Sequence, residues 1–193
     1  MFEHHTRRRF LLATGTLAAA GVSADALAQE LAPTPACHDG DEPTQRQTEG
    51  PFFKPRSPQR SDLRESGGGV AVELTDLVLT RRCQPVPGAL VDLWHADTRG
   101  EYDNSGFRFR GHQFTDPQGR YRFRTIRPPG YTGRTAHYHV KVQPKGGRVL
   151  TTQLYFPDEP GNSRDSMFRR ELLVKLAQGI DGQARFDFVL DIR

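Results

Sequence analysis

Short segments in which apolar and polar residues alternate recur along this chain, and they constrain its fold more than any other feature. The segments are 72–80, 89–95, 120–125, 136–143, 149–156 and 185–192. In 120–125, for example, Tyr121 and Phe123 alternate with three arginines. Side chains two positions apart on a strand point to the same face, so each segment predicts a strand with one dry and one wet face. Several such strands between turn signals are typical of an all-β, antiparallel sandwich.

Two further regions complete the expected organisation. Between Asp165 and Gln178, apolar residues recur at roughly helical spacing and predict one short helix. Residues 29–69 are rich in Pro, Gly, Ser and charge, lack sustained periodicity and end in three glycines. This composition favours an extended arm that packs on the domain. We therefore expect an arm at 29–69 followed by one β-sandwich domain at 70–193.

The first residues have the composition of an export signal of the twin-arginine type. Three arginines at positions 7–9 precede an apolar run at 10–22, and Ala26-Leu27-Ala28 gives a small-x-small cleavage pattern. A membrane anchor is the alternative, but the apolar run is shorter than the roughly 20 residues that span a bilayer. We expect residues 1–28 to be a cleaved signal peptide, leaving a periplasmic or extracellular protein with no membrane attachment.

Charge and cysteine content bound the partners and the redox state. Removing 1–28 takes away three arginines and two acidic residues, so the formal net charge falls from +4 to +3. Without a basic run or an aromatic ladder, this excess predicts no nucleic-acid binding. Because an exported chain meets an oxidising compartment, Cys37 and Cys83 are candidates for a disulfide, with a buried free Cys83 as the alternative.

One short stretch, GYTGRTAHYHV at 130–140, gathers groups that can bind a metal or an anion. On a strand at 136–143, His137 and His139 share one face while Tyr138 shares the other with two valines. A His-x-His pair alone is a weak signal, because surface strands carry such pairs by chance. Tyr131 lies six positions before the pair, and Tyr102 follows the strand predicted at 89–95.

Taken together and in order, several stretches resemble the intradiol ring-cleavage dioxygenases, the family of protocatechuate 3,4-dioxygenase and catechol 1,2-dioxygenase. The resemblance covers most of the chain after residue 28. It rests on TEGPFF at 48–53, VPGALVDLWHAD at 86–97, GEY at 100–102, GRYRF at 119–123, GRTAHYH at 133–139 and TQLYF at 152–156.

This resemblance implies a non-haem Fe(III) ion held by Tyr102, Tyr131, His137 and His139. Phenolate is a hard anionic oxygen suited to Fe(III), and a trivalent ion lowers a tyrosine pKa far below its free value of about 10. The substrates implied are a catechol-type compound and O2, and the product is a muconate-type diacid.

The resemblance also implies roles for other residues. Tyr131 matches the tyrosine that substrate displaces and that takes up a substrate proton. Arg134 matches an arginine beside the substrate, where a fixed cation stabilises negative charge on the ring, and Gln153 matches a pocket glutamine. The stretch from Tyr131 to His137 is shorter than in the enzymes of central aromatic catabolism, which leaves the identity of the catechol open.

Other interpretations remain at this point. The fold could serve as a non-catalytic binding module, because a fold can be retained after its original function is lost. A zinc hydrolase could use His137 and His139, but the sequence has no His-Glu-x-x-His pattern and tyrosine is an unusual zinc ligand. Trp94 is expected in the core, and His95 and His112 at the surface or behind the ligands. The sequence leaves the number of subunits open, a homo-oligomer included.

Overall fold

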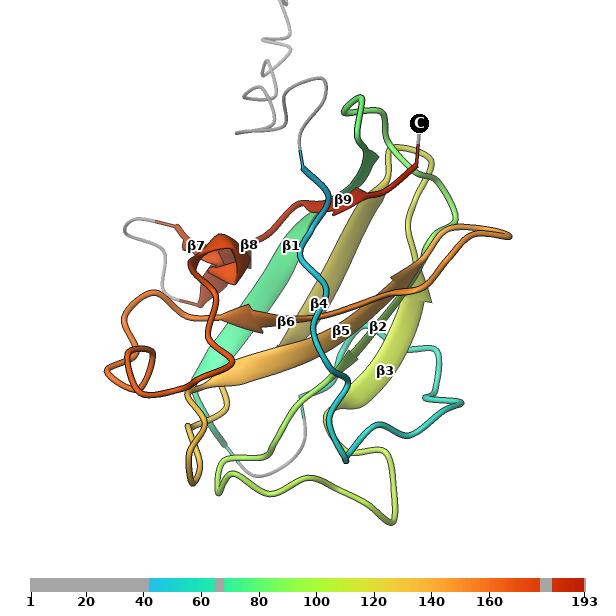
Figure 1. The fold of residues 1–193 in the computed structure, drawn as a ribbon. Helices are drawn as coiled ribbons and strands as arrows, with labels where there is room; N and C mark the ends of the chain where they lie inside the picture. Colours follow the sequence, from blue (N-terminus) through green and yellow to red (C-terminus); the bar gives the residue numbers. More distant parts are fainter. Residues whose placement is uncertain (1–41, 65–67, 178–181, 193) are drawn as a thin grey trace, which may run out of the picture. The chain divides into compact units, whose positions relative to one another are not determined.

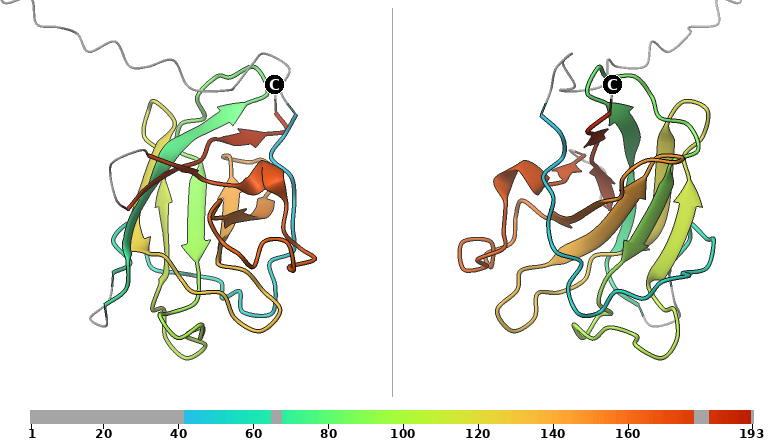
Figure 2. Two further views of the ribbon diagram at one scale, coloured as in Figure 1. Left: turned by 90° about the vertical axis from the view of Figure 1, so that its left-hand side faces the viewer. Right: turned by 45° about the vertical axis from the view of Figure 1, so that its right-hand side comes forward.

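The computed structural model describes residues 42–64, 68–177 and 182–192, which form two facing β-sheets (Figures 1 and 2). One sheet has the order β3-β2-β5-β6, and the other has the order β4-β1-β8-β7 with β9 also paired to β1. The strands are β1 (Ala71–Thr80), β2 (Leu90–Trp94), β3 (Arg110–Phe114), β4 (Arg120–Ile126), β5 (His137–Gln143), β6 (Leu150–Tyr155), β7 (Lys175–Leu176), β8 (Gln183–Arg185) and β9 (Phe188–Leu190).

The core lies between the two sheets and is built by the predicted alternation. Tyr121 and Phe123 of β4 are at most 2% exposed, while the three arginines that alternate with them are exposed. Tyr138 and Val140 of β5 are fully buried in the same core cluster. Burying each such side chain contributes about 1.5–3 kcal/mol. The prediction of an all-β sandwich is confirmed.

The sheets differ from the expectation in three details. Strand β3 was not predicted, because its sequence RGHQF has no apolar alternation. The predicted strand 185–192 is divided between β8 and β9, and the Asp187 carboxylate, instead of a backbone carbonyl, accepts the Leu77 backbone N–H between them. Strands β8 and β9 both run parallel to β1, whereas the other strand pairs of the sandwich are antiparallel.

The short helix predicted between Asp165 and Gln178 is reduced, in the described residues, to a single 3-10 turn. This turn, η1 (Arg170–Leu172), is followed by the two-residue strand β7 (Lys175–Leu176). Leu172 is buried, but the next residues become extended because Val174 N donates to the Tyr155 carbonyl at 2.8 Å. The backbone thus bonds to β6 in place of a helical turn, and the apolar spacing reflects core contacts made by an irregular segment.

Residues 42–64 run as an extended chain across the outer face of the β3-β2-β5-β6 sheet, coloured blue in Figures 1 and 2. Gln47 N donates to the Thr151 carbonyl of β6 at 2.8 Å, and Arg60 N donates to the His112 carbonyl of β3 at 3.0 Å. A bridge between Asp62 and Arg124 then ties the chain to β4 of the other sheet. This segment, called the arm below, therefore makes the outer face of the sheet a second buried layer.

The signal peptide predicted at 1–28 and Cys37 lie outside the described residues, and the domain boundaries stay predictions. Cys83, in the turn after β1, is disulfide-bonded; the predicted partner remains Cys37. Across the described ranges there is no helix with the length and apolar character needed to cross a membrane.

Candidate metal centre

His137 and His139 lie on the outer face of β5, under the arm. Both are 2% exposed, although they point away from the core between the sheets. The Nδ1 of His137 donates to the Thr135 carbonyl at 2.6 Å, so its Nε2 carries the lone pair. The local alternation of β5 thus presents two imidazoles side by side, as the sequence predicted.

Tyr131 reaches the histidines through a tight turn. Tyr131 N donates to the Arg134 carbonyl at 3.0 Å, and Arg134 N donates back to the Tyr131 carbonyl at 2.8 Å. Gly133, the third residue of this turn, has φ 76°, a conformation that a residue with a Cβ rarely adopts. The turn explains how Tyr131 and Arg134 both come close to His137.

Tyr102 is delivered by the loop that follows β2. The buried Asp97 carboxylate accepts the backbone N–H groups of Arg99 and Glu101 at 2.8 and 3.0 Å and so fixes the loop. Gly100 has φ 82°, and a Cβ there would lie 3.2 Å from the Tyr131 Cβ. A glycine at this position lets the two tyrosine-bearing segments approach each other.

The four side chains converge on one point. The His137 Nε2 lies 3.3 Å from the Tyr102 hydroxyl, 3.5 Å from the Tyr131 hydroxyl and 3.1 Å from the His139 Nε2. A neutral imidazole offers one lone pair, which cannot satisfy three polar neighbours. Ligand atoms about 2 Å from a shared metal ion lie roughly 3 Å from one another, so this crowding fits a cation site.

The ionisation of these groups fits the same interpretation. Burial lowers the pKa of His137 to about 4, with a further contribution from the Arg134 charge. Burial, followed by the charge on His137, holds the pKa of His139 well below its usual range. Burial also raises the pKa of Tyr102. The imidazoles are therefore neutral and ready to donate lone pairs, while a phenolate at Tyr102 requires a cation beside it.

Arg134 and Gln153, the other two residues predicted for the site, are bonded to each other beside this cluster. The Arg134 Nη2 donates to the Gln153 Oε1 at 2.5 Å, and the Gln153 Nε2 donates to the Thr48 carbonyl of the arm at 3.1 Å. The charge on Arg134 lowers the pKa of Tyr102, His137 and His139, after the larger effect of burial.

The chain is similar to known proteins of one family. The family profile described as Dioxygenase matches residues 48–192. Catechol 1,2-dioxygenase of Acinetobacter baylyi is 30% identical, with 73% of this chain and 56% of the relative covered. Hydroxyquinol 1,2-dioxygenase of Nocardioides simplex is also 30% identical, with 73% of this chain and 62% of the relative covered. The chain belongs to the intradiol dioxygenase family. It spans little more than half the length of these curated relatives.

Solved structures of the family show the same fold. The dioxygenase domain of a dioxygenase and carbohydrate-binding protein fusion from Streptomyces sp. SirexAA-E is 50% identical, with a TM-score of 0.76, covering 79% of this chain and 100% of that one. 3-Chlorocatechol 1,2-dioxygenase of Rhodococcus opacus 1CP is 28% identical, with a TM-score of 0.70, covering 77% and 72%.

The arm of this intradiol dioxygenase family member supplies packing residues that the sequence analysis did not assign to the site. Phe52 stacks on the Tyr102 ring, with centroids 4.4 Å apart and an interplanar angle of 14°. The buried Arg110 of β3 donates to the Phe52 carbonyl at 2.7 Å and to the Asp103 carbonyl at 3.1 Å. Tyr102 is thus held between the arm and β3. The TEGPFF stretch was a signal for this contact, but nothing in the sequence indicated Arg110.

The residues expected outside the ligand set lie around it. Trp94 is 1% exposed and stacks on the His139 ring with centroids 5.0 Å apart, so it packs under the arm instead of in the core between the sheets. His95 is buried and lies 2.6 Å from the Thr125 Oγ1 through its Nε2. His112 contacts the Ser57 hydroxyl at 3.1 Å. Trp94 therefore packs against one of the four candidate ligands, while His95 and His112 form hydrogen bonds with other residues.

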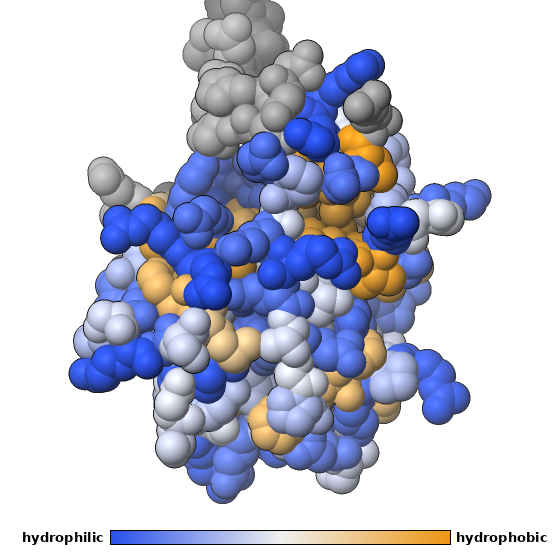
Figure 3. All heavy atoms as spheres, viewed as in Figure 1, coloured by the Kyte–Doolittle hydropathy of each residue, from blue (hydrophilic) through white to orange (hydrophobic). Residues whose placement is uncertain are grey.

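Outside the cluster, the described residues contain no group of His, Cys, Asp or Glu side chains that could hold a metal ion, but they do line a sizeable cavity. Within the described ranges, no three His, Cys, Asp or Glu side chains are grouped to hold a metal ion, so a metal at the cluster would need the tyrosines. A cavity of about 880 Å³ is lined by residues 43–46, 148–150 and 189–192, away from the cluster. Hydrophilic residues dominate the face seen in Figure 3, with hydrophobic side chains exposed in patches.

Proposed function

We propose that this protein is an Fe(III)-dependent intradiol dioxygenase that cleaves a catechol-type ring with O2 to a muconate-type diacid. The convergence of two tyrosine hydroxyls and two histidine Nε2 atoms carries the proposal. The relatives named for catechol, hydroxyquinol and chlorocatechol support the substrate class. Both atoms of O2 enter the diacid, so the reaction needs no separate reductant.

Tyr102, Tyr131, His137 and His139 would hold the iron. Fe(III) at this place would supply a Lewis acid that holds both catechol oxygens and makes the ring reactive toward O2. The donor set suits it, because two phenolate oxygens favour the ferric state and imidazole nitrogen is a common iron ligand.

The protein's own residues would perform the proton and charge chemistry. The Tyr131 phenolate oxygen, on its short turn, would accept a proton from an incoming catechol. The Arg134 guanidinium would stabilise negative charge that develops on the ring. Gln153 fixes that guanidinium by accepting from its Nη2, and the arm limits the access of water to His139 and Tyr102.

The decisive experiment is a visible spectrum of iron-loaded protein, followed by turnover. Two tyrosinates on Fe(III) should give a red-brown protein through charge transfer from ligand to metal, whereas a zinc site or an empty binding module is colourless. Adding catechol without oxygen should shift the band, and admitting O2 should form a cis,cis-muconate. Protein with full iron content that shows no such band and cleaves no catechol would leave the binding-module interpretation in its place.

We also propose that the protein is exported through the twin-arginine route to the periplasm or the exterior. Replacing Arg7 and Arg8 by lysine should keep the precursor inside the cell, because this route recognises the arginine pair. Fractionation with immunodetection measures the outcome, and the wild-type chain is the control. Export that is unchanged in the double lysine variant would refute the route.

A further inference from the structure

A buried carboxylate lies directly behind Arg134. Asp165 is in the irregular segment after β6, and its side chain is only 1% exposed. Its Oδ2 accepts the Arg134 Nε–H at 2.9 Å and the Thr135 backbone N–H at 3.0 Å. Its Oδ1 accepts the Met167 backbone N–H at 2.9 Å. The carboxylate is therefore fully engaged, and each of its bonds fixes a neighbour of the metal-binding cluster or the segment itself.

Arg134 is held on two sides by these contacts. Asp165 accepts from its Nε, and Gln153 accepts from its Nη2. An arginine side chain has several rotatable bonds, but two acceptors at different nitrogens of a planar guanidinium define its orientation. With its side chain 16% exposed, Arg134 retains an open edge that a substrate could meet.

We propose that Asp165 is a positioning residue, which acts on catalysis by orienting the Arg134 guanidinium toward the bound catechol. The inference rests on the proposed function, in which Arg134 stabilises charge on the ring. Asp165 itself touches neither the substrate nor any of the four candidate ligands. Its effect must therefore appear in the turnover of bound substrate and pass through Arg134.

Asp165 has a second link, and the test must separate it from the first. The Thr135 N–H that it accepts belongs to the residue whose carbonyl accepts from the His137 Nδ1. Action through this path would change the orientation of His137, and with it iron binding and the charge-transfer band. Action through Arg134 would leave both unchanged.

The test is a double-mutant cycle with Asp165→Asn, Arg134→Gln and the double variant, made in iron-loaded protein. Asparagine keeps an oxygen that can accept from Arg134 and Thr135 but removes the charge. We expect Asp165→Asn to lower kcat about 10-fold and Arg134→Gln about 100-fold, the range for losing charge-assisted hydrogen bonds. The double variant should match Arg134→Gln within about twofold, because a positioning residue has no effect once its target is gone.

Iron content, the visible band and anaerobic catechol binding are measured in parallel. We expect all three to be unchanged in Asp165→Asn. Arg134→Gln should also unfold at a lower temperature than the double variant, because it leaves Asp165 as a buried, unpaired carboxylate. As a second variant, Arg134→Lys keeps the charge without the planar guanidinium and should also lose about 10-fold in kcat.

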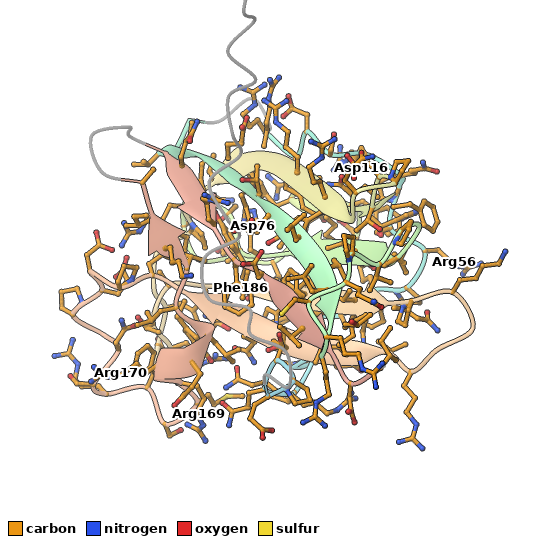
Figure 4. All side chains as sticks on the ribbon, turned by 90° about the horizontal axis from the view of Figure 1, so that it is seen from above. Arg56, Asp76, Asp116, Arg169, Arg170 and Phe186 are labelled. Carbon is orange, nitrogen blue, oxygen red and sulfur yellow. The ribbon has the colours of Figure 1, made fainter. Side chains whose placement is uncertain are left out.

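Asp116→Asn is the matched control. Asp116 likewise accepts an arginine Nε–H, from Arg120 at 2.7 Å, and two backbone N–H groups. Figure 4 shows it well separated from Arg169 and Arg170, which follow Asp165 in the chain. We expect kcat to be unchanged in this variant.

Three results would overturn the inference about Asp165 while leaving the proposed function intact. They are additive losses in the cycle, loss of iron in Asp165→Asn, and full activity of Arg134→Lys. A wild-type protein that holds iron but cleaves no catechol would refute the proposed function first, and the role of Asp165 with it.

Discussion

Replacing Tyr102 by phenylalanine is expected to remove most of the bound iron and the visible colour of the protein. We expect no other side chain to move into the place of the Tyr102 hydroxyl, because the surrounding segments are fixed. Phe52 stacks on the Tyr102 ring, and Arg110 donates to the carbonyls of Phe52 and Asp103. Loss of an outer partner of a metal ligand already costs about 10- to 100-fold in affinity. We expect loss of this ligand to cost more than about 100-fold, measured by iron content after dialysis and by the visible spectrum.

Tyr138→Phe is the control for this experiment. Tyr138 lies between the two histidines in sequence, but its hydroxyl donates to the Ile126 carbonyl at 2.9 Å on the core side of β5. Removing that hydroxyl should cost about 1 kcal/mol of stability and leave the iron in place. Equal iron content in the Tyr102 and Tyr138 variants would exclude Tyr102 as a ligand.

Much of this arrangement could be predicted from the sequence because it follows from local rules. Alternation along β5 places His137 and His139 on one face, and it places Tyr138 on the other, where the core buries it. Tyr131 lies six positions before His137 in the sequence, and the hydrogen-bonded turn at Tyr131 and Arg134 brings its hydroxyl back to that histidine. The ligand roles themselves came from the family resemblance and remain for experiment.

The features that the sequence did not predict depend on contacts between segments far apart in the chain. Strand β3 carries Gly111, where a Cβ would lie 2.6 Å from a Leu63 methyl carbon, so its pattern is set by the arm that covers it. Arg110 and Asp165 are charged residues that became buried by bonding to segments about 30 to 60 positions away. Periodicity cannot indicate such partners, because an isolated Arg or Asp in a sequence is normally expected at the surface.

The two candidate tyrosine ligands differ in how firmly the protein holds them. Tyr102 lies between Phe52 and Arg110, whereas Tyr131 is at the start of a turn whose next two residues, Thr132 and Gly133, are exposed. Nothing lies within 4 Å of a Cβ built on Gly133, so the exposed side of this turn is not packed against the rest of the protein. Of the two candidate ligands, Tyr131 is therefore the one better able to move when a substrate enters.

Tyr131→Phe should accordingly keep a substantial part of the iron and lose turnover. Phenylalanine preserves the ring contact with His137, whose centroid lies 5.6 Å away, but it removes the phenolate oxygen that would accept the substrate proton. Since general base catalysis contributes about 10²- to 10⁴-fold, we expect kcat to fall at least about 100-fold. Single-turnover measurements that start from a preformed catechol complex should give a rate close to that of the wild type, because the steps after substrate binding do not use this oxygen. Such a result would locate the defect in substrate binding. Loss of iron equal to that in Tyr102→Phe would show that both tyrosines are permanent ligands and that another group accepts the proton.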